Sequence, residues 1–418
     1  MLRYLTAGES HGRALVVILE GVPSGLPLTV DAIGAELARR RLGYGRGPRM
    51  RFEADEITIL AGVRHGRTLG SPIAIEIGNS EWESKWTEEM SPHPGQTSQR
   101  LTTPRPGHAD LTGMQKYAFD DARNVLERAS ARETAARVAA GAVAKALLSH
   151  LGTEVGSHVI ALGGVRAADG LRPGPGGFDA VDESEVRCLD AAAEAVMIET
   201  IRAAQKAGDS LGGVVEVVAH GVPIGLGSHV HWDRRLDGLL AQALLSIQAV
   251  KGVEIGDGFD VAARPGSQAH DPIVWDAEHS VYRRISANAG GIEGGMSTGE
   301  VLVAHVAMKP LATLNKPVLA TVDTATKEAG VSFRERTDVT AVPAMGVVAE
   351  AMMALVLADE SLRKFGGDSL GEFVRNHDSF VAQVRSQSAR IDTGADDAEA
   401  APLNWDEGLA FDDGSRPR

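Results

Sequence analysis

Two histidines stand in short, glycine-containing segments in which an imidazole side chain could move a proton. His11 lies in the GESHG segment at residues 8–12, and His108 lies in the RPGHAD segment at residues 105–110. Histidine titrates near neutral pH, so either residue could act as a general acid or base. Either could also be a structural histidine in a turn, and the residues alone leave both interpretations open.

Two other kinds of chemistry fit these segments poorly. A Ser-His-acid hydrolase is not supported by Ser10 and His11, because the members of such a triad come from positions that are distant in sequence. His108 and Asp110 could contribute to a metal site, but histidines in separate segments lack a diagnostic ligand spacing. We therefore expect no metal.

A run of arginines interrupts an otherwise acidic chain. The whole chain has a formal net charge of −14, which disfavours a general nucleic-acid binder. Between residues 39 and 51, however, there are six arginines and no acid: Arg39, Arg40, Arg41, Arg46, Arg49 and Arg51. Their forked donors match phosphate and carboxylate groups, so the cluster favours a small anionic ligand. A solvated basic surface is the alternative.

A helix start is predicted where residues 130–133 spell the S-x-x-E capping box. The helix should begin near Ala131 and run to Ser149, with Gly152 as its stop. Backbone amides at the start of a helix suit an anion such as phosphate, and here these belong to Arg128, Ala129 and Ser130. The alternative is an ordinary buried helix with a good cap.

Apolar runs and helical periodicity predict the elements that position these residues. Strands are expected at 14–19, 57–60, 73–77, 159–162, 214–219 and 301–308. Helices are expected at 31–42, 131–149, 233–249, 344–364 and 370–383. The polar segment 78–100 contains two tryptophans and should be a functional or mobile loop.

A sequence repeat within the chain suggests two related halves. The stretch VVILEGVPSGLP, from Val16, returns as VEVVAHGVPIGLG, from Val215, and the Gly-Val-Pro turns are 200 residues apart. Each copy precedes a predicted helix, so we infer two strand-helix halves within one domain. A chance match remains the alternative, because G-x-P-x-G turns are common.

Composition indicates a soluble globular protein, while the length of 418 residues allows one large domain or two to three of ordinary size. Apolar residues make up 43% and charged residues 23%, and Cys188 is the single cysteine, which suits a reducing compartment. We expect a cytoplasmic protein with no membrane segment. The domain should span residues 1–390, and residues 391–418, with eight acids and two arginines, should form a disordered acidic tail.

Five motifs follow one another along the chain. They are the GESHG segment continuing to the Gly-Val-Pro turn, RPGHAD followed by ERASARET (127–134), IQAVKGVE (247–254), NAGGIEGGM (288–296), and RTDVT (336–340) with Glu350 downstream. In sequence and in order they resemble the motifs of the chorismate synthases. Thr337 departs from the family pattern, which usually has Ser or His there. Together the motifs cover residues 1 to about 370.

The resemblance implies both a fold and a reaction. The expected fold is α/β in the broad sense (α+β), a β-α-β sandwich with antiparallel sheets around helices, assembled as a homotetramer. The family converts 5-enolpyruvylshikimate 3-phosphate to chorismate and phosphate by 1,4-elimination in the shikimate pathway. It requires reduced FMN although the reaction involves no net oxidation.

The resemblance also distributes roles among residues. His11 would protonate the leaving phosphate, His108 would act at flavin N1, and Asp338 would be the carboxylate behind flavin N5 when the C6 proton is removed. Substrate-binding residues would be Ser10, Arg40, Arg46 and Arg49. Cofactor-binding residues would be Arg128, Ala129, Ser130, Gln248, Ala249, Gly294, Lys309, Pro310, Leu311, Ala312, Thr313 and Arg336. A tight hairpin is the alternative interpretation of the glycine pairs at 290–291 and 294–295.

Two competing functions remain. Some family members reduce their own flavin with NADPH, but no added nicotinamide-binding stretch is visible here, so we expect an external reductant with NADPH acting only indirectly. A non-enzymatic RNA- or anion-binding protein is disfavoured by the net charge.

Overall fold

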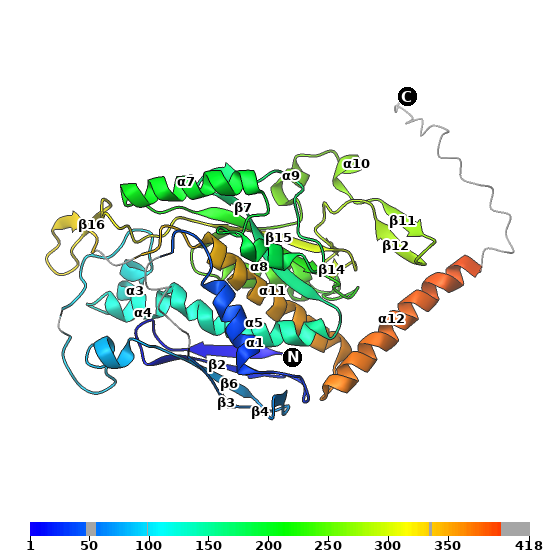
Figure 1. Cartoon of the computed structure of the whole chain (residues 1–418), viewed down its shortest axis with the longest axis horizontal. Helices are drawn as coiled ribbons and strands as arrows, with labels where there is room; N and C mark the ends of the chain where they lie inside the picture. The colour runs from blue at the N-terminus through cyan, green and yellow to red at the C-terminus, as the bar shows by residue number, and fades with distance from the viewer. Residues whose placement is uncertain (47–55, 98, 334–336, 394–418) are drawn as a thin grey trace, which may run out of the picture.

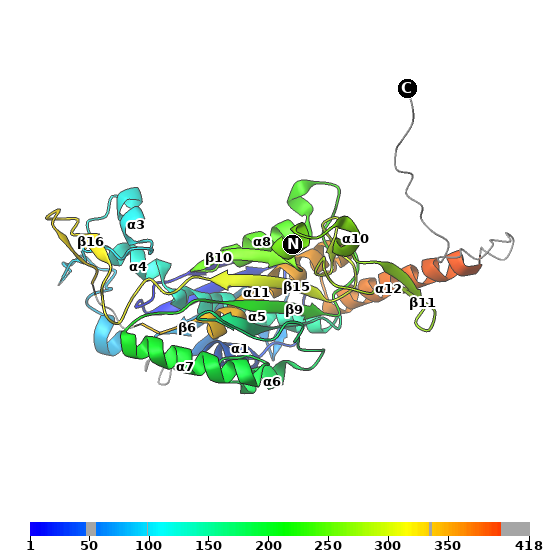
Figure 2. The same cartoon turned by 90° about the horizontal axis from the view of Figure 1, so that it is seen from above.

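The structure is a computed structural model that describes residues 1–46, 56–97, 99–333 and 337–393. Two antiparallel sheets enclose a layer of helices, as the resemblance implied (Figures 1 and 2). In Figure 1 the smaller sheet lies at the bottom, helices α1, α5 and α11 cross the middle, and the larger sheet lies above them. The expectation of an α+β sandwich is therefore confirmed.

The two sheets and four hairpins have the following members. The smaller sheet has the order β1 (Arg3–Ala7), β2 (Ala14–Glu20), β6 (Ile73–Gly78), β3 (Ile57–Ala61). The larger has the order β10 (Val250–Ile255), β15 (Leu302–Met308), β9 (Gly213–His220), β7 (Glu154–Leu162), β8 (Val165–Arg166). The hairpins are β4 (Val63–Arg64) with β5 (Arg67–Thr68), β11 (Ile273–Asp276) with β12 (Val281–Arg284), β13 (Ile292–Glu293) with β14 (Met296–Ser297), and β16 (Ala320–Val322) with β17 (Ala329–Val331).

The helices fall into a central group and a peripheral group. The central ones are α1 (Val30–Arg40), α5 (Thr134–Ser149), α8 (Leu236–Leu245) and α11 (Val342–Phe365). The others are α3 (Asp110–Tyr117), α4 (Arg123–Ala129), α6 (Phe178–Glu183), α7 (Ala191–Ala207), α9 (Gly258–Ala262), α10 (Gly266–Ala269) and α12 (Leu370–Thr393). Short turns are the π-helix η1 (Trp82–Trp86) and the 3-10 helices η2 (Ala131–Glu133) and η3 (Trp232–Arg234).

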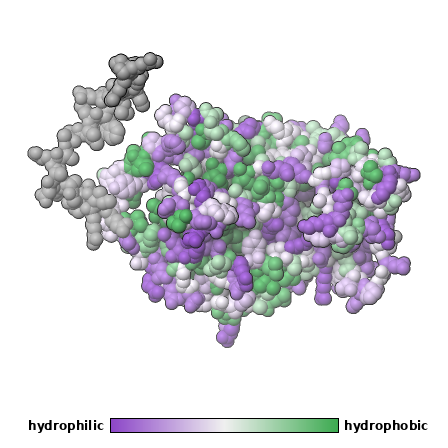
Figure 3. Space-filling model, turned by 180° about the vertical axis from the view of Figure 1, so that it is seen from behind, coloured by the Kyte–Doolittle hydropathy of each residue, from purple (hydrophilic) through white to green (hydrophobic). Residues whose placement is uncertain are grey.

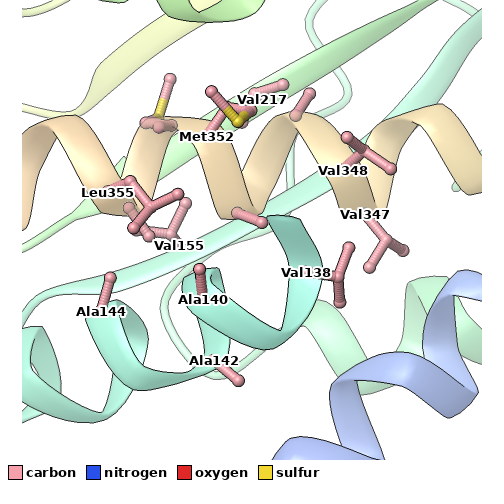
Figure 4. Close-up of a cluster of buried hydrophobic side chains, with 14 of the residues drawn as sticks. Val138, Ala140, Ala142, Ala144, Val155, Val217, Val347, Val348, Met352 and Leu355 are labelled. Atoms are coloured by element: carbon pink, nitrogen blue, oxygen red, sulfur yellow. The ribbon is translucent and has the colours of Figure 1, made fainter. Parts of the chain in front are cut away.

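Small side chains let the two longest central helices approach closely. Figure 4 shows Ala140 and Ala144 of α5 below Leu355 of α11, and Val138 of α5 below Val347, with Val155 and Val217 of the larger sheet nearby. A Cβ atom added to Gly141 of α5 would stand 2.3 Å from the Cβ atom of Ala351, so only glycine fits at this crossing. The alanine-rich sequence of α5 is thus explained by packing.

α11 is the core helix of the domain. It is the one helix in the described part of the chain that is long and apolar enough to cross a membrane, and 89% of its apolar window is buried inside the protein. Burial on all sides by protein accounts for its composition, as it does for other fully enclosed helices.

The internal repeat extends through the whole domain. The strand order β1-β2-β6-β3 in the smaller sheet is matched by β7-β9-β15-β10 in the larger. Each set includes a short hairpin, β4–β5 in one and β13–β14 in the other, and each set is completed by two helices, α1 and α5 or α8 and α11. The prediction of two strand-helix halves is confirmed.

The echoed turns are held by the same hydrogen bonds. In the first half the Thr68 hydroxyl donates to Pro23 O at 2.6 Å and accepts from Leu26 N at 2.9 Å. In the second half the Ser297 hydroxyl donates to Pro223 O at 2.6 Å and accepts from Leu226 N at 2.8 Å. The glycines that open both turns have positive φ, 93° and 65°, which explains why glycine recurs there.

Several predicted boundaries need correction. The first central helix begins after Thr29, whose side chain caps Ala32 N, and it ends at Arg40. α8 begins at Leu236, because residues 232–234 form a separate 3-10 turn. The segment 78–100, expected as a loop, contains the π-helix η1.

The last helix is longer than the sequence suggested. α12 leaves the body of the protein from a buried base at Phe373 and runs to Thr393, ten residues past the predicted end (Figures 1 and 2). Residues 391–393, assigned to the acidic tail, are therefore helical, and residues 394–418 lie outside the described part. The face in Figure 3 mixes hydrophilic and hydrophobic residues over the body of the protein.

Candidate active site

In the described part of the chain, the predicted site residues other than Gly294 lie where corresponding connections of the two halves meet. In the first half these connections join β1 to β2, α1 to β3, and β6 to α5. In the second half they join α8 to β10 and β15 to α11. All of them leave the same end of each sheet, which we call the site end.

His11 is fixed by a buried carboxylate and an aromatic ring. Its Nδ1 lies 2.9 Å from Glu127 Oε1, and its backbone amide donates to Glu127 Oε2 at 2.8 Å. Its ring stacks on Trp86 of η1 with the centroids 3.9 Å apart. Burial would raise the pKa of Glu127, but hydrogen bonds and charge from His11, together with Arg123, hold the pKa of this carboxyl below its usual value. The sequence predicted neither partner.

His108 has a similar arrangement in the loop before α3. Its Nδ1 lies 2.5 Å from Asp110 Oδ1, and Arg105 Nε donates to Asp110 Oδ2 at 2.8 Å. The Asp110 side chain is fully buried, which would raise its pKa, yet the hydrogen bonds from His108 and Arg105 hold the pKa of this carboxyl well below its usual range. Arg105 also donates to Thr313 Oγ1 at 2.8 Å, which joins the His108 loop to the segment after β15.

Glu133 connects the first two motifs to Gln248. It accepts from Thr6 Oγ1 at 2.7 Å, from Arg137 Nε at 2.9 Å and from Gln248 Nε2 at 2.9 Å. Burial would raise its pKa, but Arg137 and these hydrogen bonds lower it overall. Beside this network Ser130 Oγ donates to Ser10 Oγ at 3.1 Å.

The predicted capping box does not form. Ser130 Oγ does accept a backbone hydrogen bond, from Arg132 N at 3.3 Å, but Glu133 turns to the network described above. Moreover, Arg128 and Ala129 are the last residues of α4 rather than the first of a helix, so they do not offer free amides at a positive dipole end. Arg128 instead donates from its guanidinium to Gly8 O and Thr6 O.

Gln248 and Ala249 form a strained link between α8 and β10. Ala249 has φ of 67°, in the left-handed region that costs a non-glycine residue about 1–3 kcal/mol. Gln248 Oε1 is buried and has no hydrogen-bond partner among the described residues. Ala249 O accepts from Lys309 N at 3.0 Å, and Lys309 Nζ donates to Gly107 O, so this link contacts both the 309–313 segment and the His108 loop. At such a strained turn, Gln248 Oε1 can accept a hydrogen bond from an N–H group of a ligand.

The arginine cluster separates into residues with different roles. Arg40 is buried and donates to Thr134 Oγ1 and Ala131 O, both at 3.0 Å, so it ties α1 to the start of α5. Arg39 points into the core. Arg46 Nε lies 2.9 Å from Asp338 Oδ2, which pairs a predicted substrate residue with the predicted base. Arg49 and Arg336 lie outside the described residues.

Gly294 is not brought together with the other predicted cofactor residues. It lies in the β13–β14 turn, where Gly294 and Gly295 both have positive φ, so the tight-hairpin interpretation describes this glycine pair. The preceding Gly291 packs against Leu302, the first residue of β15, whereas Lys309 follows its last residue. The length of β15, at about 3.3 Å per residue, puts these ends roughly 20 Å apart.

Sequence reasoning missed several residues that shape the site. Glu127, Glu133 and Arg105 all belong to motifs that the sequence revealed. The contact of Glu127 with His11, and those of Glu133 with Thr6 and Gln248, however, join residues that are 115 or more positions apart. Trp86 gave one signal, because a tryptophan in a polar segment needs an apolar surface to cover.

Comparison with known proteins gives one family. The family model described as chorismate synthase matches residues 2–362. The chain is 59% identical to a chorismate synthase of Nocardioides sp., over 92% of this chain and 100% of the relative, and 57% identical to one of Streptomyces coelicolor, over 91% and 98%. A solved structure described as chorismate synthase is similar with a TM-score of 0.74 and 43% identity, covering 92% of this chain and 98% of its own.

Proposed function

The chain belongs to the chorismate synthase family, and from that premise we propose how its own residues divide the work. The enzyme is a carbon–oxygen lyase of aromatic biosynthesis that forms chorismate and phosphate from 5-enolpyruvylshikimate 3-phosphate. The observation that carries the assignment is the convergence of the His11, His108 and Asp338 segments at the site end of both halves.

Binding of the substrate needs several cations, because it bears a phosphate dianion and two carboxylates. We assign this task to Arg46 and Arg49, with Ser10 as a hydroxyl donor. Arg40 has a supporting role. Arg40 is buried and occupied by Thr134 and Ala131, so its contribution is to hold the start of α5. A guanidinium that pairs with Asp338 in the free protein can exchange that partner for the substrate at little cost.

Two proton transfers are required, and the chain has a group for each. As the carbon–oxygen bond to phosphate breaks, His11 stabilises the leaving oxygen by donating a proton. Asp338 is assigned as the carboxylate that finally receives the C6 proton. Its Oδ2 lies 2.9 Å from Arg46 Nε, so the proposed base stands next to a proposed substrate-binding residue.

The family requires a reduced flavin, and we propose that it is FMN. The buried acceptor Gln248 Oε1 and the strained Ala249 fit a planar ligand with N–H groups, and we assign as its holders His108 together with Arg128, Ala129, Ser130, Gln248, Ala249, Lys309, Pro310, Leu311, Ala312, Thr313 and Arg336. When bound, the reduced flavin supplies an electron that is returned in each turnover, so that no net oxidation occurs. Gly294 is left out of this set, because it lies near the opposite end of β15 from Lys309.

We also propose an assembly and a cellular setting for this enzyme. A homotetramer is supported by exposed apolar residues on one face of the smaller sheet, where Leu5, Ile18 and Leu60 are 71%, 43% and 56% exposed. We propose a cytoplasmic enzyme whose flavin is reduced from outside, with NADPH acting indirectly. Intrinsic flavin reduction by NADPH is the second candidate function.

Phosphate release under anaerobic conditions tests the function. With substrate and dithionite-reduced FMN we expect stoichiometric release of phosphate and formation of chorismate, and with oxidised FMN neither. Adding NADPH and oxidised FMN should give no activity until an external reductase is supplied. Release of phosphate without any reduced flavin would overturn the proposal.

A further inference from the structure

Each of the two site histidines has Nδ1 against a buried carboxylate. The Glu127 side chain is 2% exposed and that of Asp110 is 0% exposed. An ionised carboxylate can only accept hydrogen bonds, so Nδ1 of each histidine must carry the proton in these contacts. Nε2 is then the unprotonated nitrogen of each ring when the ring is neutral, and in His108 it lies 3.3 Å from Arg105 Nη2.

The carboxylates are themselves held from several sides. Glu127 receives the backbone amide of His11 as well as its ring, and Arg123 Nη1 donates to it at 3.2 Å. Asp110 receives the backbone amide of Arg105 at 3.1 Å and the Arg105 side chain. Neither carboxylate can rotate away without breaking these bonds, so each ring has one preferred orientation.

We propose that Glu127 and Asp110 are positioning residues, which fix His11 and His108 with Nε2 toward the reaction and hold a negative charge behind each ring. The proposal rests on the proposed function of the two histidines. A histidine that only fills a turn needs no charged partner, and burying a carboxylate without need is costly. A carboxylate on Nδ1 instead fixes the tautomer and stabilises the protonated ring.

Further charged groups surround each histidine–carboxylate pair. Around His11 they are Glu127 and Arg123, with Glu89 behind Arg123 at 3.5 Å. Around His108 they are Asp110 and Arg105, with Lys309 on the neighbouring Gly107. Removing the charge of the carboxylate leaves an arginine beside the histidine ring, and this positive charge disfavours protonation of the ring. A step that needs a protonated histidine should therefore be lost at a lower pH in the variant than in the wild type.

The chain offers a matched control in Glu216. This carboxylate is also buried and also contacts histidine rings, His158 and His305, at 3.1 Å each. It lies in the middle of β9, on the face of the larger sheet opposite to the core residue Val217. Glu216→Gln therefore disturbs a buried histidine–carboxylate contact without touching the site end.

The test measures kcat, KM and the pH dependence of kcat for Glu127→Gln, Asp110→Asn and Glu216→Gln with saturating reduced FMN. We expect kcat to fall about 10²-fold in the first two with KM little changed, and the alkaline limb of the Glu127→Gln profile to move about one unit to lower pH. Glu216→Gln should keep the wild-type kcat and profile. Normal kcat and an unshifted limb in Glu127→Gln would overturn the proposal.

Two further measurements distinguish a failure of the positioning role from a failure of folding and from a failure of the proposed function. If Glu127→Gln fails to fold, Glu127→Asp retains the charge and should keep the alkaline limb in place while kcat falls, and a normal kcat in that variant would contradict positioning. Wild-type enzyme that releases no phosphate with reduced FMN would instead contradict the proposed function itself.

Discussion

The two halves of the domain share a frame and differ in what their connections carry. The first half contributes both histidines and the arginine cluster, and its β1–β2 connection is a short turn around His11. In the second half the corresponding β7–β9 connection contains β8, α6 and α7, whereas the α8–β10 and β15–α11 connections carry Gln248, Lys309 and Asp338. A duplicated frame therefore holds unlike chemistry, because connections can change without altering strand order or core packing.

A buried carboxylate joins the two halves. Glu350 of α11 is fully buried and pairs with Arg39 of α1 at 2.7 Å and Lys145 of α5 at 2.6 Å, both from the first half. From the second half it receives Arg187 at 2.9 Å and Ser157 Oγ at 2.6 Å. Burial would raise the pKa of Glu350, but Lys145, Arg39 and Arg187 hold it well below its usual value.

The largest expected effect comes from breaking this joint. Glu350→Ala leaves three cations without their shared partner and should destabilise the domain by about 3–5 kcal/mol, measured by urea unfolding. The exposed Glu20→Ala, which breaks only the pair with Arg3, is the control and should cost less than about 1 kcal/mol. Similar losses in the two variants would show that the halves are joined by apolar packing alone.

The same carboxylate gives a pH dependence with a definite sign. Because the folded pKa of Glu350 lies below that of the unfolded chain, whose reference is 4.5, its contribution to stability is present above that value. It is lost as the pH falls below 4.5 toward the folded pKa. The free energy of unfolding of the wild type should therefore fall more steeply than that of Glu350→Gln as the pH is lowered below 5. Parallel curves of the two free energies against pH would contradict this.

Next in size is the effect expected at Asp338, which the second half supplies. If this residue is the base, Asp338→Asn keeps its shape and should lower turnover about 10²- to 10⁴-fold while folding and FMN affinity persist. If its task is to hold Arg46, stability and FMN binding should fall together. Turnover, FMN titration and unfolding on one preparation separate these, and unchanged turnover would exclude Asp338 as the base.

A smaller and paired effect tests the equivalence of the two turns. Thr68 and Ser297 are each 3% exposed, and Thr68→Val and Ser297→Ala each remove a hydroxyl that is bonded to the same backbone groups of its turn. Each should cost about 1–3 kcal/mol, and the two losses should be similar. A loss in only one variant would mean that the two hydroxyls contribute differently to the free energy of unfolding, although their hydrogen bonds are alike.

The smallest effect concerns the segment beyond both halves. Deleting residues 394–418, which are acidic and poor in large apolar residues, should leave the melting temperature and turnover nearly unchanged. A fall of several degrees would show that this segment packs on the domain.

Features that depend on neighbouring residues could be predicted from the sequence. The repeated Gly-Val-Pro turns were recognisable because positive φ at glycine and a buried leucine a few positions on are local requirements. Alternating and helical apolar patterns located the central helices and six strands of the two larger sheets, namely β2, β3, β6, β7, β9 and β15. The motifs also named the histidines, because residue type alone determines which side chains titrate near neutrality.

Features that depend on how distant elements cross were decided only by the tertiary structure. Ser130 and Glu133 satisfy the pattern of a capping box, yet Glu133 binds Thr6 and Gln248 because β1 and the α8–β10 link pass beside it. Arg39, Arg40 and Arg46 look alike in sequence, but they lie respectively in a core ion network, against the start of α5, and on Asp338. A charged side chain takes whichever partner the fold brings within reach, and burial then determines how strongly that partner holds it.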